Sequence, residues 1–167
     1  FAALQSFSAE VSLDDQIQEM EKQNASGANI VAQLALRGNG VVMGWRGTLH
    51  PFVRHPSWLD MQELDWSAQY ERLKDPAFKA QLLAESSASP EQPDLIPIFT
   101  IITQGWHMQY PMGSDFDYEP QADESIAALA AAANMSCEEY AYDLMMRDGG
   151  NGFVYLPILN YQDGNLD

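Results

Sequence analysis

Apolar positions recur at helical spacing near the start of the chain. Leu13, Ile17 and Met20 stand at i, i+4 and i+7, a spacing that predicts an amphipathic helix. Ser12 is suited to cap its N-terminus, two aspartates follow in the first turn, and a glycine stands where the helix should end. The apolar residues 28–36 come next and predict a buried strand. A helix and a strand joined by a short loop form an α/β unit.

The chain from residue 38 to residue 95 does not continue this α/β pattern. Two His-Pro pairs favour extended or turn backbone before each proline. Apolar spacing predicts a short helix over 66–73, and Asp75-Pro76 is typical of the start of a second. The polar, proline-bearing residues 86–93 are the best candidate for a linker. A long insertion with short helices of its own is typical of a lid or a binding loop.

Four apolar or well-capped segments follow the insertion. Residues 95–103 form an apolar run of strand length and predict a second buried strand. Two helices are then expected, one starting at Asp123 or Glu124 and the other at a capping box that begins with Ser136. Residues 153–159 form a third apolar segment, but the proline within it argues against a central strand.

The pattern as a whole predicts a mixed, helix-rich α/β fold. A chain of 167 residues has the size of one domain and can bury a sizeable core. We expect three segments within that domain. They are a helix–strand unit over 1–37, an insertion over 38–95, and a strand, two capped helices and a last apolar segment over 96–167.

The charge and the cysteine content restrict which binding partners and which cellular compartment we expect. The formal net charge is −16, from 8 basic and 24 acidic side chains. Such a surface repels phosphate backbones and anionic membranes, so we expect neither nucleic acid nor a membrane as partner. The start at Phe1 has no signal-peptide pattern and suggests a processed chain or a piece of a longer one. Cys137 is the single cysteine, which fits a reducing, cytoplasmic compartment.

Few side chains stand out as candidates for chemistry. His50, His55 and His107 lack the spacing of a zinc site, and we expect loop histidines with solvent or backbone partners. Cys137 follows a helix cap, but two glutamates beside it oppose a thiolate, so a structural role is expected. Arg37 directly follows an expected strand, where barrel enzymes place substrate-facing side chains. It could bind a substrate carboxylate or neutralise nearby acidic groups.

Several longer segments occur in a distinctive order. They are 49–52 (LHPF), 72–85 (RLKDPAFKAQLLAE), 117–120 (DYEP), 125–130 (SIAALA), 138–144 (EEYAYDL) and 155–167 (YLPILNYQDGNLD). Together with the expected strand that ends at Arg37, they resemble the N-acyl-D-amino-acid deacylases of the amidohydrolase superfamily. The resemblance covers nearly the whole chain. Each segment is moderately specific, and their order and spacing strengthen the likeness.

This resemblance implies a metal-dependent (β/α)8 barrel that hydrolyses the amide bond of a small N-acyl-D-amino acid. Zinc would activate the water and polarise the acyl carbonyl, and an aspartate near the last strand would be general base and acid. Nothing here matches the family's His-x-His or its Asp-Ala-Gly-Ala-His-like run. We therefore expect a partial (β/α)8 barrel with a lid-like helical insertion, without catalytic residues or metal ligands, binding no zinc and inactive alone. Arg37 and, from the lid, His50 would line the substrate side.

A non-enzymatic reading stays open beside this one. An acidic α/β module could bind a partner or a small ligand through the aromatic region 38–95. The aromatic residues of that region would then form an exposed patch; they are Trp45, Phe52, Trp58, Trp66 and Tyr70. A segment of a barrel exposes strand edges, so we also expect the isolated chain to form homo-oligomers or to rearrange its strands.

Overall fold

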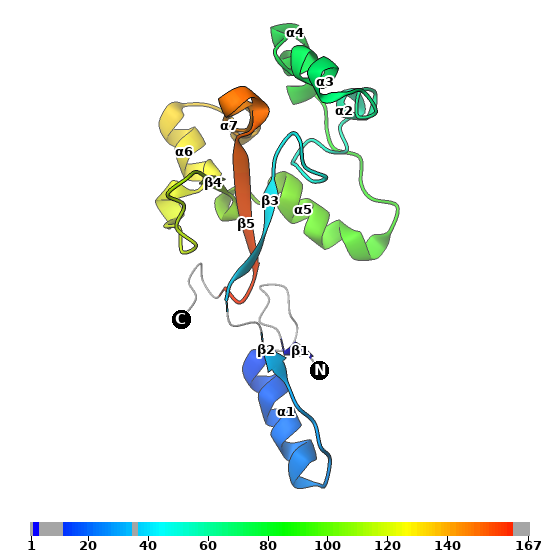
Figure 1. Cartoon of the computed structure of the whole chain (residues 1–167), viewed down its shortest axis with the longest axis vertical. Helices are drawn as coiled ribbons and strands as arrows, with labels where there is room; N and C mark the ends of the chain where they lie inside the picture. The colour runs from blue at the N-terminus through cyan, green and yellow to red at the C-terminus, as the bar shows by residue number, and fades with distance from the viewer. Residues whose placement is uncertain (1, 4–11, 35–36, 162–167) are drawn as a thin grey trace. The chain divides into compact units, whose positions relative to one another are not determined.

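The computed structural model describes residues 2–3, 12–34 and 37–161 (Figure 1). The chain is 49% helical and 13% strand, so the expected mixture of helix and sheet is confirmed. The described strands form no barrel. The chain divides into two compact units, which we call unit 1 (Phe1–Val41 with Pro157–Asp167) and unit 2 (Val42–Leu156). None of the described helices is long and apolar enough to cross a membrane.

The described residues of unit 1 include a helix and a pair of very short strands. Helix α1 (Leu13–Ala25) begins where the sequence predicts, because the Ser12 hydroxyl accepts a hydrogen bond from the Asp15 backbone N–H at 3.1 Å. Strands β1 (Ala2–Ala3) and β2 (Gln33–Leu34) pair in parallel. The local sequence of α1 is therefore sufficient to define its start.

The buried strand expected over residues 28–36 is wrong in both length and burial. Only β2 (Gln33–Leu34) is strand among its described residues, and both residues of β2 are exposed. The Asn24 side chain binds both backbone groups of Ile30, at 2.9 and 2.7 Å, and so holds the chain after α1 in a loop. The pairing of β1 with β2 covers only two residues. It therefore provides no sheet surface against which the apolar residues after α1 could be buried.

The larger sheet has three strands in the order β3 (Asn39–Met43), β5 (Phe153–Leu159) and β4 (Tyr110–Met112) (Figure 1). Strand β5 is therefore central, contrary to the expectation drawn from Pro157. Its antiparallel pairing with β4 covers only residues 153–155, so the missing N–H of Pro157 falls outside that ladder.

Residues 95–103 are helical, and the strand expected there is wrong. A 3-10 turn, η1 (Pro93–Leu95), leads into helix α5 (Ile96–Gln104). Pro97 lies in the first turn of α5, where a backbone N–H has no intrahelical partner to lose. Of the α5 residues only Ile102 is fully buried. A short apolar run is compatible with helix or strand, and here the proline-bearing turn decides for the helix.

Two of the other helices of unit 2 begin at predicted caps, and a third begins at a different residue. These other helices are α2 (Pro56–Leu59), α3 (Trp66–Leu73), α4 (Pro76–Leu83), α6 (Ile126–Ala133) and α7 (Cys137–Gly150), with 3-10 turns η2 (Trp106–Met108) and η3 (Ala122–Glu124). Asp75 and Ser136 cap α4 and α7 as predicted. Helix α6 is capped by Ser125 instead of Asp123 or Glu124, because those two residues form η3.

The core of unit 2 is a cluster of rings, which we call the aromatic cluster: Trp45, His50, Phe52, Trp58 and Tyr142. The Trp45 ring centroid lies 5.3 Å from those of Phe52 and Trp58 and 5.0 Å from that of Tyr142. The exposed aromatic patch expected for a binding module is therefore wrong for these tryptophans and Phe52, which are at most 5% exposed. Their rings hold unit 2 together.

Candidate functional site

The two residues expected on the substrate side belong to different units. Arg37 is an exposed residue of unit 1, and its backbone carbonyl accepts a hydrogen bond from the Asn160 side-chain amide at 2.9 Å. His50 belongs to the aromatic cluster of unit 2 and has no exposed surface. A substrate role for Arg37 stays a prediction. His50 lines none of the cavities described below.

His50 is a buried neutral side chain. Burial lowers its pKa to about 3, and the nearby His55 adds to the effect. Neither ring nitrogen has a hydrogen-bond partner among the described residues, and the ring packs edge-on against Trp58 at 4.3 Å between centroids. The solvent or backbone partner expected for His50 is therefore absent among the described residues. The rings of Trp45, Phe52 and Trp58 surround the imidazole instead.

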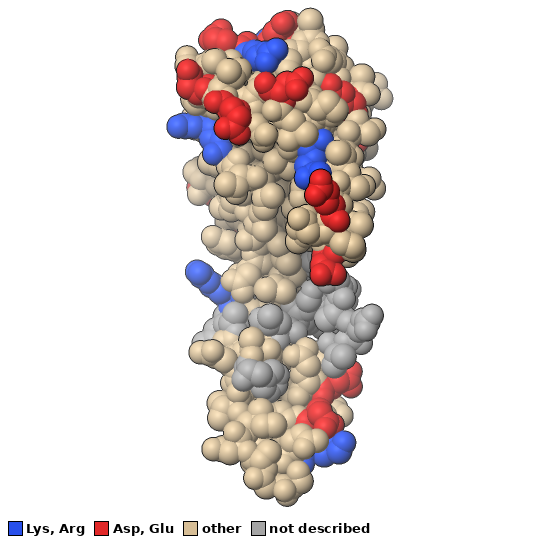
Figure 2. Space-filling model, turned by 90° about the vertical axis from the view of Figure 1, so that its right-hand side faces the viewer, with Lys and Arg blue, Asp and Glu red and all other residues tan. Residues whose placement is uncertain are grey.

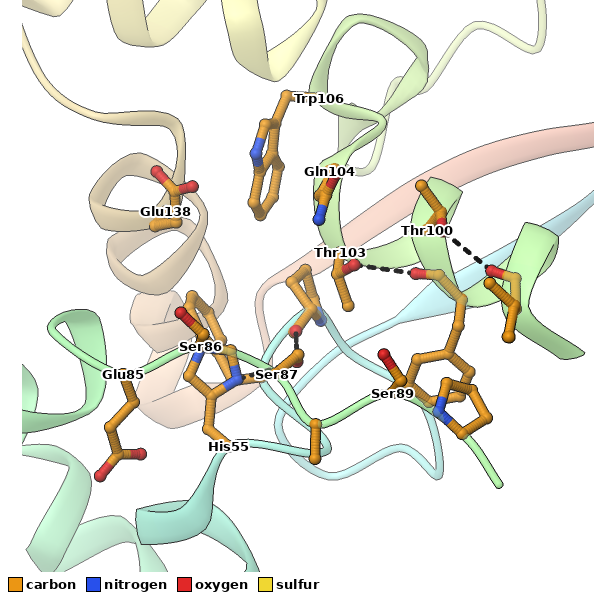
Figure 3. A pocket seen from close by; sticks show the side chains of 16 residues that line it. His55, Glu85, Ser86, Ser87, Ser89, Thr100, Thr103, Gln104, Trp106 and Glu138 are labelled. Atoms are coloured by element: carbon orange, nitrogen blue, oxygen red, sulfur yellow. Dashed lines mark hydrogen bonds between the residues drawn. The ribbon is translucent and has the colours of Figure 1, made fainter. Parts of the chain in front are cut away.

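A cavity of about 220 Å³ lies between residues 51–55, residues 85–90 and helix α5 (Figure 3). Hydroxyl groups dominate its polar lining; they belong to Ser86, Ser87, Ser89, Thr100 and Thr103. The rings of Phe52, Phe99 and Trp106 supply its apolar walls. We call it the serine cavity.

The serine cavity contains a histidine–serine pair. His55 Nδ1 lies 3.1 Å from the Ser87 hydroxyl, which can also donate to the Pro51 carbonyl at 3.4 Å. Burial lowers the pKa of His55, and the charges of Glu85 and Glu138 oppose that shift. The lowered pKa favours the neutral imidazole, which can share a hydrogen bond with the hydroxyl beside it.

The two carboxylates near His55 are held differently. Glu85 accepts hydrogen bonds from the backbone N–H of Ser57 at 2.9 Å and from its hydroxyl. Burial raises the pKa of Glu85, but the hydrogen bonds from Ser57 and Gln81 lower it by more, so the net shift is downward. Since Glu85 is bound to Ser57, the exposed Glu138 is the carboxylate left free to meet a ligand at the cavity edge.

The segment beside the cavity is anchored at several points, although its composition predicts a linker. The Arg54 guanidinium donates to the carbonyls of Ala88 and Ser89 at 2.8 and 3.1 Å. The Ala88 N–H returns a hydrogen bond to the Arg54 carbonyl at 3.1 Å. This forked contact fixes the segment against residues 51–55 and so keeps Ser87 beside His55.

The remaining candidates from the sequence add no further chemistry to this cavity. Burial raises the pKa of the Cys137 thiol, and Glu138 raises it further, which agrees with a structural cysteine. His107 is exposed. Among the described residues, no three His, Cys, Asp or Glu side chains converge as metal ligands.

Comparison with protein-family models, with curated proteins and with solved structures found no match to this chain. Sequence reasoning also missed the His55–Ser87 pair. These residues are 32 positions apart, and no spacing rule links a His-Pro pair to a serine-rich segment. The usable signal was weaker: both lie in the stretch from 38 to 95 that the sequence marks as a lid or binding loop.

Proposed function

We propose that this chain is the lid-bearing segment of a metal-dependent amidohydrolase that hydrolyses N-acyl-D-amino acids. The segment belongs, in this proposal, to a partial (β/α)8 barrel, and it is inactive alone. The observation that carries the proposal is the ordered series of segments from 49–52 to 155–167 that resembles this family. The acidic composition and the single cysteine are consistent with a cytoplasmic protein that binds a small substrate.

Contacts between these segments support the proposal. Tyr142, of the segment EEYAYDL, donates its hydroxyl hydrogen to the carbonyl of Leu73, of the segment RLKDPAFKAQLLAE, at 2.6 Å. The ring of Phe52, of LHPF, lies 6.0 Å from that of Tyr142. Residues far apart in sequence that contact one another are expected if the segments belong to one inherited structural unit.

An ion-pair network links the same segments a second time. The Lys79 ammonium lies 3.2 Å from the Glu139 carboxylate and 2.7 Å from that of Asp143. All three side chains come from segments that carry the resemblance. The contacts among 49–52, 72–85 and 138–144 therefore involve both polar and apolar groups, which is expected of a shared core and lid base.

In the proposed parent enzyme, zinc would activate the attacking water and polarise the amide carbonyl. The described residues assemble no set of ligands that fits the metal, so we assign no step of the reaction to them. This chain's part is to cover the substrate with residues 38–95 and to offer Arg37 for a carboxylate. We further propose that the isolated chain associates into homo-oligomers through its open strand edges.

The test combines gene sequence with an activity assay. We expect the gene that encodes this chain to carry a His-x-His upstream and an Asp-Ala-Gly-Ala-His-like run downstream. Its full product should release the amino acid from N-acetyl-D-amino acids, with activity lost to a chelator and restored by zinc. The chain of 167 residues, assayed beside it with zinc, should show no activity. Hydrolysis by that chain, or a complete reading frame without both motifs, would contradict the proposal.

A further inference from the structure

A second cavity of unit 2 has the opposite character from the serine cavity. It has a volume of about 390 Å³, within the usual range for small-molecule sites. Three indole rings and one guanidinium dominate its lining, with two side-chain amides beside them. We call it the tryptophan cavity and define it by Trp45, Trp58, Trp66, Arg46, Gln62 and Gln69.

The charge of this cavity is unusual for the chain. The protein carries 24 acidic side chains, and Figure 2 shows acidic groups scattered over one face, yet none lines the tryptophan cavity. Arg46 lies over the Trp66 ring, 5.4 Å from its centroid, and donates one hydrogen bond to Asn151 Oδ1 at 3.0 Å. It forms no ion pair with any carboxylate that the structure describes. A guanidinium has five N–H donors, so most of its capacity is left for a ligand.

The walls of the cavity are held in place before any ligand binds. Gly150 has a φ of +84°, and a Cβ there would lie 2.5 Å from the Trp66 ring, so this residue allows the ring to pack closely against the backbone. Gln69 donates to the carbonyls of Met61 and Gln62 at 3.3 and 2.9 Å. Preorganised walls reduce the entropy that binding must overcome.

We propose that the tryptophan cavity binds a small organic carboxylate. Its acid group pairs with Arg46, and its planar apolar part lies against Trp58 and Trp66. A single guanidinium among apolar walls suits a monoanion. A polyphosphate would need more positive charge and would be repelled by a chain of net charge −16. The Trp45 Nε1–H is buried and has no hydrogen-bond partner among the residues that the structure describes, and the assignment does not depend on it.

Two kinds of compound share this chemistry: free aryl or indolyl carboxylic acids and N-acylated aromatic amino acids. The second kind would connect the cavity with the proposed deacylase, whereas the first would not. The inference itself does not rest on that function, because every contact that carries it lies within unit 2. Absence of the family motifs from the gene would therefore leave it standing.

The test is calorimetric titration of the whole chain with indole-3-acetate, indole-3-acetamide, N-acetyl-D-tryptophan and N-acetyl-L-tryptophan. We expect the carboxylates to bind, and the uncharged amide to bind at least about tenfold more weakly, since hydrogen bonds to charged groups are the stronger ones. Arg46→Met should weaken carboxylate binding by about ten- to a hundredfold and leave amide binding unchanged. Preference for the D over the L compound would point to the acylated amino acids, and equal binding of all carboxylates to the free acids.

Arg72→Met is the matched control. Its guanidinium also lies over a ring, 5.6 Å from the Phe78 centroid, but Arg72 does not line the tryptophan cavity. This variant should bind carboxylates as the unmodified chain does. Equal affinity for indole-3-acetate and its amide, unchanged affinity in Arg46→Met, or no binding of any compound at millimolar concentration would each overturn the proposal. If Arg46→Met does not fold, as judged by circular dichroism, the acid–amide comparison on the unmodified chain decides.

Discussion

Trp45 in unit 2 and Val31 in unit 1 are both apolar residues close to short strands, but 1% of the first and 74% of the second is exposed. The contrast extends to their surroundings. Trp45 contacts four other rings of the aromatic cluster. In unit 1, α1 has no buried residue, and Leu34 of β2 is 45% exposed.

This difference separates structure formed by local sequence from structure formed by distant contacts. Helix α1 has a Ser12 cap and a Lys22–Glu19 ion pair at 3.1 Å, all within one short stretch. The aromatic cluster joins residues 45–58 to Tyr142, almost a hundred positions away. Burial of these rings therefore stabilises unit 2, whereas helix α1 of unit 1 depends mainly on local contacts.

The largest difference between the two units is expected when the central ring of unit 2 is removed. Trp45→Ala should destabilise the protein by about 3–5 kcal/mol, the usual cost of truncating a buried tryptophan. Val31→Ala should change stability by less than about 0.5 kcal/mol, because the side chain is mostly exposed. Urea unfolding followed by far-UV circular dichroism measures both. Similar costs for the two variants would mean that burial does not distinguish the units.

The next effect concerns pH and His50. Its folded pKa is about 3 against a reference of 6.5, so the unfolded chain binds the extra proton between these values and stability falls as the pH drops through that window. The loss attributable to His50 between pH 7.5 and pH 5 should be about 2 kcal/mol. His50→Leu should remove that part of the pH dependence in urea unfolding curves. An unchanged slope in His50→Leu would show that the folded His50 is protonated or exposed.

A smaller effect tests the link between the segments that carry the family resemblance. Tyr142→Phe removes the buried hydrogen bond to the Leu73 carbonyl and should cost about 1–2 kcal/mol. Tyr140→Phe, on the same helix but only half-buried, is the control and should cost less than about 0.5 kcal/mol. Thermal unfolding of the three proteins gives the comparison. If Tyr142→Phe is as harmless as its control, α7 is not fixed to the end of α3 by this bond.

The smallest effect concerns the ion pairs of the same interface. Lys79→Met removes contacts to Glu139 and Asp143, whose side chains are 42% and 49% exposed, so water screens them. The cost should be at most about 1 kcal/mol and should shrink in 1 M salt. Lys74→Met, beside the exposed Glu71, should leave the unfolding midpoint unchanged. A large, salt-independent loss in Lys79→Met would indicate that the contact of its ammonium with the Tyr142 ring, 5.5 Å from the centroid, matters more than the exposed ion pairs.

The sequence predicts what short stretches determine. Ser12, Asp75 and Ser136 cap helices because a side chain and the N–H groups it binds lie within three residues of each other. Residues 95–103 failed as a strand because a short apolar run has no period that separates strand from helix. The mixed helix and sheet content was predictable for the same local reasons.

The candidate sites were far less predictable. The burial of His50 depends on Trp45, Trp58 and Phe52 around it, and the His55–Ser87 pair depends on the fork that Arg54 forms with the next segment. Each requires knowing which distant segments meet, and a single sequence gives no such information. The substrate role expected for Arg37 rests on the family resemblance alone.

The central claim is that unit 2 holds an extensive buried core, whereas helix α1 of unit 1 has no buried residue and draws its stability mainly from contacts within its own stretch of sequence. Hydrogen exchange of the whole chain, read by mass spectrometry at peptide level, tests it directly. We predict that amides of α3 and α7 exchange at least about a hundredfold more slowly than those of α1, since protection follows burial and long-range contact. Protection of α1 equal to that of α7 would contradict the claim.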